Sequence, residues 1–210
     1  MKKFLLFILL TLVTVTGFSQ SKTKVDTIIR NGAYESHFNL GLKESLFVTY
    51  KLYKGGGDCS RTGFRFKNDT KIPMATVKDY AASGYDQGHL VSAEDYAYDC
   101  VADEKTFRFY NCLPQTPNLN RGIWKKWESE IRKESQINEL YIITGGHFTT
   151  KITIGNGVWV PTHCFKVVQD VKTKKIKHVL FFTNTEEATC TIMTLKDLEK
   201  ILGYKLPILK

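Results

Sequence analysis

The sequence predicts an α+β fold in which a central antiparallel sheet is flanked by helices. Two observations predict it: several segments are rich in β-branched and aromatic residues, and two others carry apolar residues at helical spacing. The expected strands are residues 45–53, 106–112, 140–144, 158–171 and 176–183. The first of them stops at three consecutive glycines, Gly55 to Gly57, which is typical of a turn after a strand.

The residues ahead of the first expected strand, 21–30, are polar and show no clear period. We expect a loose lead-in there rather than a regular element. Residues 21–210 contain no internal repeat, low-complexity tract or linker, and their number suits one domain with a substantial core. We therefore expect a single domain over this range.

The first helical segment is residues 121–133. Its apolar residues are Ile123, Trp124, Trp127 and Ile131, while lysines and glutamates fill the remaining face. This spacing predicts an amphipathic helix that packs one side against the sheet.

A second, shorter helix is predicted near the end of the chain. Thr194 suits its N-cap, with Asp197 three residues later, and Gly203 suits its C-terminal end. Its apolar stripe consists of Leu195, Leu198, Ile201 and Leu202.

The first 20 residues have the layout of a secretory signal peptide. Two lysines precede an apolar run from Phe4 to about Phe18, and small and polar residues follow. The run is shorter than a comfortable membrane span, and no other segment approaches that length. We expect cleavage near Ser19 or Gln20, a mature domain that does not engage the membrane, and a secreted or periplasmic location.

Charge and cysteine content limit the possible partners only loosely. The formal charge of +9 becomes +7 when Lys2 and Lys3 leave with the signal peptide, and a positive excess favours phosphate-rich partners. Many exported proteins are simply basic, so charge alone does not decide. The five cysteines contain no C-x-x-C pair, which argues against a structural zinc site. Cys100 and Cys112 would close a short loop, but the pairing is left open.

The segment YDQGH, residues 85–89, is a candidate for chemistry. Its Gly88 and the preceding Gly84 suggest a sharp turn that holds His89 at a fixed angle, and Asp86 could orient or balance its surroundings. An imidazole has an ordinary pKa of about 6.5, which suits proton abstraction near neutral pH. Taken alone, an aspartate, a glycine and a histidine in a turn are more often a hydrogen-bonded loop than an active site.

A second candidate segment lies on the first helix. Asn120 and Glu128 are separated by about 80° around a regular helix, so both can border one cavity. An amide oxygen with a carboxylate beyond it suits Mg²⁺, which keeps several of its waters. The simpler interpretation is a helix cap and a solvated surface charge.

Together these segments resemble the DNA/RNA non-specific nucleases of the ββα-metal (His-Me finger) class. In that family a DRGH-type turn supplies the catalytic histidine, and a downstream N-x-x-P-Q, then L-N-x-G-x-W and a glutamate, supply the metal ligand. Here the motifs stand in the same order as DQGH (86–89), NCLPQ (111–115) and LNRGIWKKWE (119–128). SLFVTYKL, YIITGG, VPTHCFKVV and TLKDLEKILGYKL resemble further family segments, so nearly all of the mature chain is covered.

The resemblance implies a role for each matching residue. His89 is expected to be the general base, Asn120 the Mg²⁺ ligand, with Mn²⁺ able to substitute, and Glu128 the anchor for metal-bound water. Asn111 is expected to position the site, and Asp86 to support His89.

Two positions are less clear. The family's upstream arginine, which neutralises phosphate charge, could be Arg61 or Arg65, and spacing favours Arg61. Gln87 replaces the arginine usual in the DRGH turn, so a positive charge near the cleaved phosphate is missing. We expect this to affect rate and substrate preference more than reaction class.

The sequence thus predicts a secreted, Mg²⁺-dependent endonuclease that cuts DNA, RNA or both to 5′-phosphate products, with little sequence preference because attack is on the backbone. Two alternatives remain. One is a catalytically silent domain that binds nucleic acid or another polyanion, in which Gln87 marks a decayed site. The other is a basic, disulfide-stabilised secreted protein with no nucleic-acid role.

Overall fold

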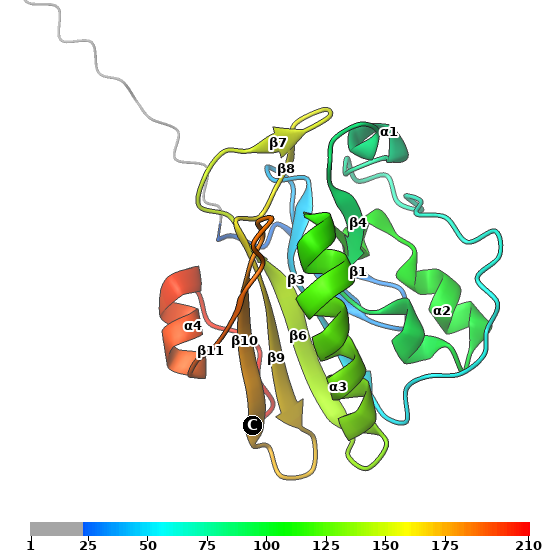
Figure 1. The fold of residues 1–210 in the computed structure, drawn as a ribbon, viewed down its shortest axis with the longest axis vertical. Helices are drawn as coiled ribbons and strands as arrows, with labels where there is room; N and C mark the ends of the chain where they lie inside the picture. Colours follow the sequence, from blue (N-terminus) through cyan, green and yellow to red (C-terminus); the bar gives the residue numbers. More distant parts are fainter. Residues whose placement is uncertain (1–22) are drawn as a thin grey trace, which may run out of the picture.

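A computed structural model describes residues 23–210; the expected signal peptide lies outside the described residues. Within this range seven strands form one antiparallel sheet, in the order β1-β2-β3-β6-β9-β10-β11 (Figure 1). Their bounds are Thr27–Arg30 (β1), Glu35–Asn39 (β2), Glu44–Leu52 (β3), Leu140–His147 (β6), His163–Asp170 (β9), Ile176–Thr183 (β10) and Cys190–Ile192 (β11). The predicted α+β architecture around an antiparallel sheet is confirmed.

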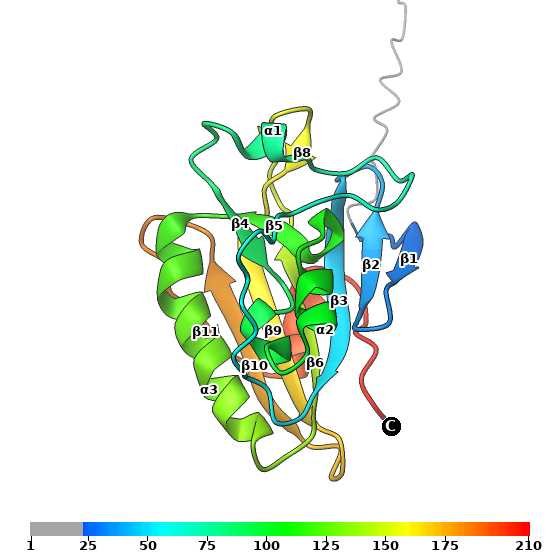
Figure 2. The same cartoon turned by 90° about the vertical axis from the view of Figure 1, so that its right-hand side faces the viewer.

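Helices cover both faces of this sheet (Figures 1 and 2). One face carries α4 and the C-terminal segment, where Tyr204 stacks on Phe47 of β3. The other face carries α2, α3 and a small two-stranded sheet, and Trp124 packs there against Phe182 of β10. The remaining elements are α1 (Val77–Tyr80), β4 (Asp86–His89), η1 (Ala93–Tyr96), α2 (Cys100–Thr106), η2 (Phe109–Asn111), β5 (Cys112–Gln115), η3 (Leu119–Trp124), α3 (Lys125–Ser135), β7 (Thr153–Ile154), β8 (Val158–Trp159) and α4 (Leu195–Leu202).

Both predicted helices form. The amphipathic segment becomes α3, preceded by the widened turn η3, in which Gly122 leaves helical geometry with φ −101° and ψ −111°. Trp124 and Ile131 are buried as the apolar spacing predicts. Irregular turns of this kind often accompany functional sites. Because of it, the 80° estimate for a regular helix does not describe how Asn120 and Glu128 are related.

The C-terminal helix α4 ends as its sequence predicts. The Thr194 hydroxyl accepts a hydrogen bond from the backbone N–H of Asp197 at 3.1 Å. Gly203 follows in the left-handed region with φ 78°, which glycine adopts without steric cost. Leu198 and Leu202 are buried against the sheet.

The expected turn at YDQGH is wrong in detail, because Asp86 to His89 form strand β4. This strand pairs with β5, so the DQGH motif lies directly against the CLPQ segment of NCLPQ. Gly88 is needed for this pairing: a Cβ added there would lie 2.2 Å from the Gln115 side-chain oxygen. The glycine therefore serves a close approach between strands rather than a turn.

Three further expectations fail. Residues 106–111 of the expected strand 106–112 are not a strand, and only Cys112 begins one, β5. Helix α2 ends at Thr106 and the turn η2 follows, because Asn111 N–H bonds to Arg108 O and its side chain to Thr106 O. Residues 158–171 are broken into β8 and β9 around Pro161, which has no N–H for a ladder. Residues 27–30 of the expected lead-in form β1, because β2 pairs with them.

A disulfide joins Cys59 to Cys100. It ties the loop before Arg61 to the start of α2. The pairing that the sequence left open is thereby decided: Cys100 does not pair with Cys112, which is a free, buried cysteine with its sulfur 3.2 Å from the Tyr80 hydroxyl. Among residues 23–210 no helix is long and apolar enough to cross a membrane.

Candidate active site

A pocket of about 540 Å³ lies between the end of β4, the turn η3 and helix α3. Four of the six predicted site residues line it: Arg61, His89, Asn120 and Glu128. A larger hollow of about 690 Å³ between β2, β3 and α2 contains none of the six. The fold therefore gathers residues spread over 67 sequence positions (61 to 128) into one place.

His89 projects from the last position of β4. Its ring lies between those of Phe66 and Phe107, at centroid distances of 4.6 and 4.8 Å. Its backbone carbonyl accepts a hydrogen bond from Trp124 Nε1 at 3.2 Å, which fixes β4 to the helical segment. Within the described residues Nε2 has no hydrogen-bond partner.

The surroundings of His89 favour its neutral form. Burial, together with the positive charges of Arg61 and Lys166, lowers its pKa to about 3. The imidazole is therefore uncharged at neutral pH, as a general base must be before reaction.

Asn120 lies in η3, with its side chain held by Asp86. Asn120 Nδ2 donates to Asp86 Oδ2 at 2.9 Å. This bond occupies the amide nitrogen, and no described residue donates a hydrogen bond to Asn120 Oδ1. Asp86 was expected to support His89; the structure shows it orienting Asn120 instead.

Arg121 binds the same carboxylate. Its Nε and Nη2 donate to the two Asp86 oxygens at 2.8 and 2.6 Å. These bonds, with that from Asn120, hold the pKa of Asp86 below its usual range. Asp86 is therefore ionised at neutral pH, and its carboxylate holds the Arg121 guanidinium and the Asn120 amide in place.

Glu128 is buried on α3 beside a lysine that the sequence analysis did not single out. Lys166 of β9 is 1% exposed, and its Nζ lies 3.8 Å from Glu128 Oε1 and 3.9 Å from the centre of the Trp124 ring. At that distance Oε1 has no hydrogen bond within the described chain. Burial raises the pKa of Glu128 to about 7, although Lys166 opposes the rise.

Arg61, not Arg65, borders the pocket. Its guanidinium donates from Nε to Asp103 at 2.8 Å and from Nη2 to Glu94 at 2.9 Å. The exposed Arg65 donates to the carbonyl of Phe64 and lines a separate hollow beside α2. The spacing argument and the geometry thus favour the same arginine.

Asn111 is fully buried behind the pocket. Its side chain accepts from Val91 N at 2.8 Å and donates to the carbonyls of Val91 and Thr106 at 3.0 and 2.9 Å. These bonds fix the chain just after His89. The geometry suits a positioning residue that does not itself enter the pocket.

The sequence analysis did not identify Arg121 as a site residue, and it also missed two further cations at the site, Arg132 and Lys166. Arg132 lines the pocket and binds Asp95 and Ser92, at 2.9 and 3.1 Å. Its position four residues after Glu128 was a usable signal, since such residues share a helix face. Lys166 was visible as a lone lysine in the apolar strand sequence HCFKVV.

The donor set fits a cation that keeps most of its waters. Among the residues that the structure describes, no cluster of three or more histidine, cysteine, aspartate or glutamate side chains could hold a metal. The pocket instead offers the Asn120 carbonyl oxygen and the unpartnered Glu128 Oε1. Mg²⁺ is commonly bound through few protein oxygens and several waters.

Comparison with known proteins places the chain in a family. Residues 15–207 match the family described as DNA/RNA non-specific endonuclease. The chain belongs to this family. The resemblance of DQGH, NCLPQ and LNRGIWKKWE is thereby confirmed as a family relationship.

Named relatives share moderate identity. Mitochondrial endonuclease G of Caenorhabditis elegans is 36% identical over 169 residues, which cover 72% of this chain and 54% of that protein. The Bos taurus endonuclease G is 33% identical, covering 59% and 48%, and human mitochondrial nuclease EXOG is 29% identical, covering 70% and 47%. The chain spans about half the length of these curated relatives.

A solved structure shares the fold. A chain in the crystal structure of the EndoG/EndoGI complex superposes with a TM-score of 0.77 at 20% identity, covering 86% of this chain and 85% of the other. This supports the expected ββα-metal nuclease fold.

Proposed function

We propose that this protein is an exported, divalent-metal-dependent endonuclease that hydrolyses phosphodiester bonds of DNA, RNA or both without sequence preference. The observation that carries the proposal is the pocket in which His89, Asn120, Glu128 and Arg61 meet. A neutral base, an oriented amide oxygen, a buried carboxylate and a fixed guanidinium are the parts that phosphodiester hydrolysis requires.

His89 is the general base. Its neutral imidazole accepts a proton from the attacking water, and the water oxygen forms a bond to phosphorus. The bond to the 3′ oxygen breaks, which leaves a 5′-phosphate and a 3′-hydroxyl after proton uptake. A bound phosphate anion raises the pKa of a neighbouring histidine, so substrate binding strengthens this base.

The other residues hold the substrate and the site. Arg61 faces the phosphate with a guanidinium that Asp103 and Glu94 keep in place. A divalent cation, which we propose to be Mg²⁺ with Mn²⁺ able to substitute, would be held by Asn120 and by waters bound to Glu128 and would stabilise the departing 3′ oxygen.

The test is digestion of supercoiled plasmid and of RNA in Mg²⁺ or in EDTA, with wild type, His89→Ala and Asn120→Ala. Wild type should cut only with the metal. His89→Ala should lose at least about a hundredfold in rate, the usual contribution of acid–base catalysis, and Asn120→Ala should lose most of the metal-dependent cutting because it removes the proposed metal ligand. End-labelling should find 5′-phosphates. Equal cutting by wild type and His89→Ala would overturn the assignment.

A matched control is His37→Ala. His37 lies in β2, stacked on Phe47 at 4.2 Å, and does not line the pocket. It should cut like wild type. Tight nucleic-acid binding without metal-dependent cutting would instead identify a catalytically silent binding domain.

Export is a separate part of the proposal. It rests on the signal-peptide layout of residues 1–20 and is supported by the Cys59–Cys100 disulfide, which an oxidising compartment permits. Mass spectrometry of the protein from medium or periplasm should give an N-terminus near Ser19 or Gln20. Intact Met1 on protein retained in the cytoplasm would contradict export.

A further inference from the structure

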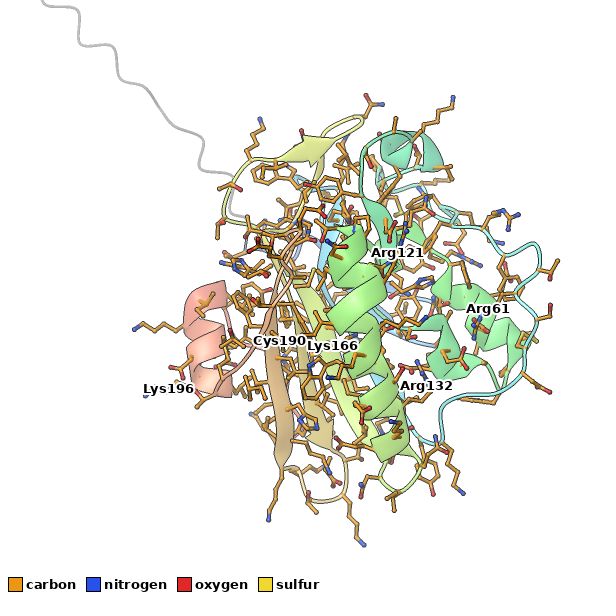
Figure 3. The ribbon with its side chains drawn as sticks, in the orientation of Figure 1. Arg61, Arg121, Arg132, Lys166, Cys190 and Lys196 are labelled. Atoms are coloured by element: carbon orange, nitrogen blue, oxygen red, sulfur yellow. A yellow bond between two sulfur atoms is a disulfide. The ribbon has the colours of Figure 1, made fainter. Side chains whose placement is uncertain are left out.

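The cations around the pocket differ in how far they are exposed. The side chains of Arg61 and Arg132 are 33% and 16% exposed, and each is held by carboxylates behind it. Arg121 is 70% exposed. In Figure 3 Arg121 and Arg132 lie along the side of α3 that faces α2, with Arg121 at the η3 end, and Arg61 lies across from them beside α2. Of the three arginines, Arg121 is therefore the one that a ligand entering the pocket can contact without moving other side chains.

Arg121 is nevertheless fixed. Its Nε and Nη2 grip both oxygens of Asp86, while Nη1 makes no hydrogen bond to any residue in the described chain. Asp86 is only 16% exposed and also holds Asn120. The Arg121 guanidinium is therefore fixed in position beside the expected metal ligand. A pre-ordered guanidinium with a free edge suits a phosphate oxygen.

Electrostatics point the same way. Asp86 orients Asn120, but its carboxylate also places a negative charge beside a pocket that must accept a phosphate. Arg121 offsets this charge, and without it the Asp86 carboxylate would weaken the attraction of the pocket for an anion. The neighbouring strand position cannot compensate, because Gln87 is neutral. Side chains alternate along a strand, so position 87 shares the face of β4 from which His89 projects.

We propose that Arg121 binds a backbone phosphate of the nucleic acid next to the cleaved bond, supplying the positive charge that Gln87 does not. The inference rests on the proposed function. It adds a substrate-contacting residue and a reason why glutamine at position 87 is tolerated.

The test is binding of a fluorescent DNA duplex in EDTA, so that neither cleavage nor the metal enters the result. Arg121→Gln should weaken binding by about tenfold at 0.1 M salt, and the slope of log Kd against log salt should fall by about 0.9, the value for one lost phosphate contact. A residue that only supports the fold would not change this slope. Arg121→Lys should keep the slope.

The rescue variant is Gln87→Arg with Arg121→Gln. An arginine at position 87 should restore both affinity and slope, since it places a positive charge on β4, the strand that carries His89. The matched control is Arg30→Gln, because Arg30 is also an exposed arginine paired with a carboxylate, that of Glu35, but lies outside the pocket. This control should bind like wild type.

The outcomes separate the two proposals. If wild type binds DNA and Arg121→Gln binds with unchanged affinity and slope, the inference is wrong while the nuclease assignment stands. If Arg121→Gln binds DNA more weakly and the added Gln87→Arg change does not restore the affinity, Arg121 does not supply the charge that is missing at position 87. If wild type neither cuts nor binds, the proposed function itself fails.

Discussion

The imidazole of His89 shows how packing determines the charge of one side chain. Phe66 and Phe107 enclose its ring, and Arg61 and Lys166 add positive charge nearby. All of these disfavour protonation. The same residue in an unfolded chain has an ordinary pKa of about 6.5. Folding therefore lowers the pKa of His89, and this has a consequence for stability.

We predict that His89 makes the protein less stable in acid. Between about pH 6.5 and pH 3 the unfolded chain takes up a proton at His89 that the folded chain does not, so the free energy of unfolding falls as pH falls, by up to about 1.4 kcal/mol per pH unit. Urea unfolding of wild type and His89→Gln at pH 4, 5, 6 and 7 measures this. The variant should show a shallower dependence; parallel curves would contradict the assigned pKa shift.

The pair of short strands β4 and β5 is the element that makes the site possible. Their register sets Asp86 opposite Gln115 and His89 opposite Cys112. This aligns the two sequence motifs and delivers His89 to the pocket. The pairing depends on Gly88, because the Gln115 side chain fills the space that a larger residue would need.

We predict that Gly88→Ala is destabilising by about 1–3 kcal/mol, the usual cost of overpacking. Its added Cβ collides with Cγ, Cδ and Oε1 of Gln115. Since all three atoms are removed in Gln115→Ala, the double variant should be more stable than the sum of the single effects allows. Chemical denaturation of the four proteins completes the cycle. Strict additivity would show that the collision is not the cause.

At the scale of the whole molecule, charge is distributed to suit an anionic polymer. The formal charge is +9 for the full sequence and +7 for residues 21–210, which lack Lys2 and Lys3. Four cations, Arg61, Arg121, Lys125 and Arg132, border one pocket with Glu94 and Glu128. Such a distribution attracts nucleic acid without reading bases.

We predict that wild-type affinity for duplex DNA in EDTA falls by about 40- to 150-fold between 50 and 200 mM salt. This is the range for three to four phosphate contacts on the counterion-release relation. Fluorescence anisotropy at several salt concentrations measures it, with a random-sequence and a defined duplex compared. A flat salt response would argue against a phosphate-binding groove, and a strong difference between the duplexes would argue against backbone recognition.

Much of this fold was predictable from short-range patterns. The helical period predicts α3, and Thr194 with Gly203 predicts both ends of α4, because caps and periodicity act within a few residues. Strand prediction failed where long-range contacts decide the structure. Asn111, for example, bonds to Val91, 20 positions away, and holds a turn where aromatic content favours a strand.

The sequence by itself determined the family motifs, the residue types of the site and the two helices, since these are properties of neighbouring residues. Only the tertiary structure decided how the site residues relate. Asp86 binds Asn120 and Arg121 across 34 and 35 positions, and Lys166 of strand β9 approaches Glu128 of helix α3. YDQGH is a paired strand rather than a turn. Such contacts depend on how the elements pack, and no local pattern encodes that packing.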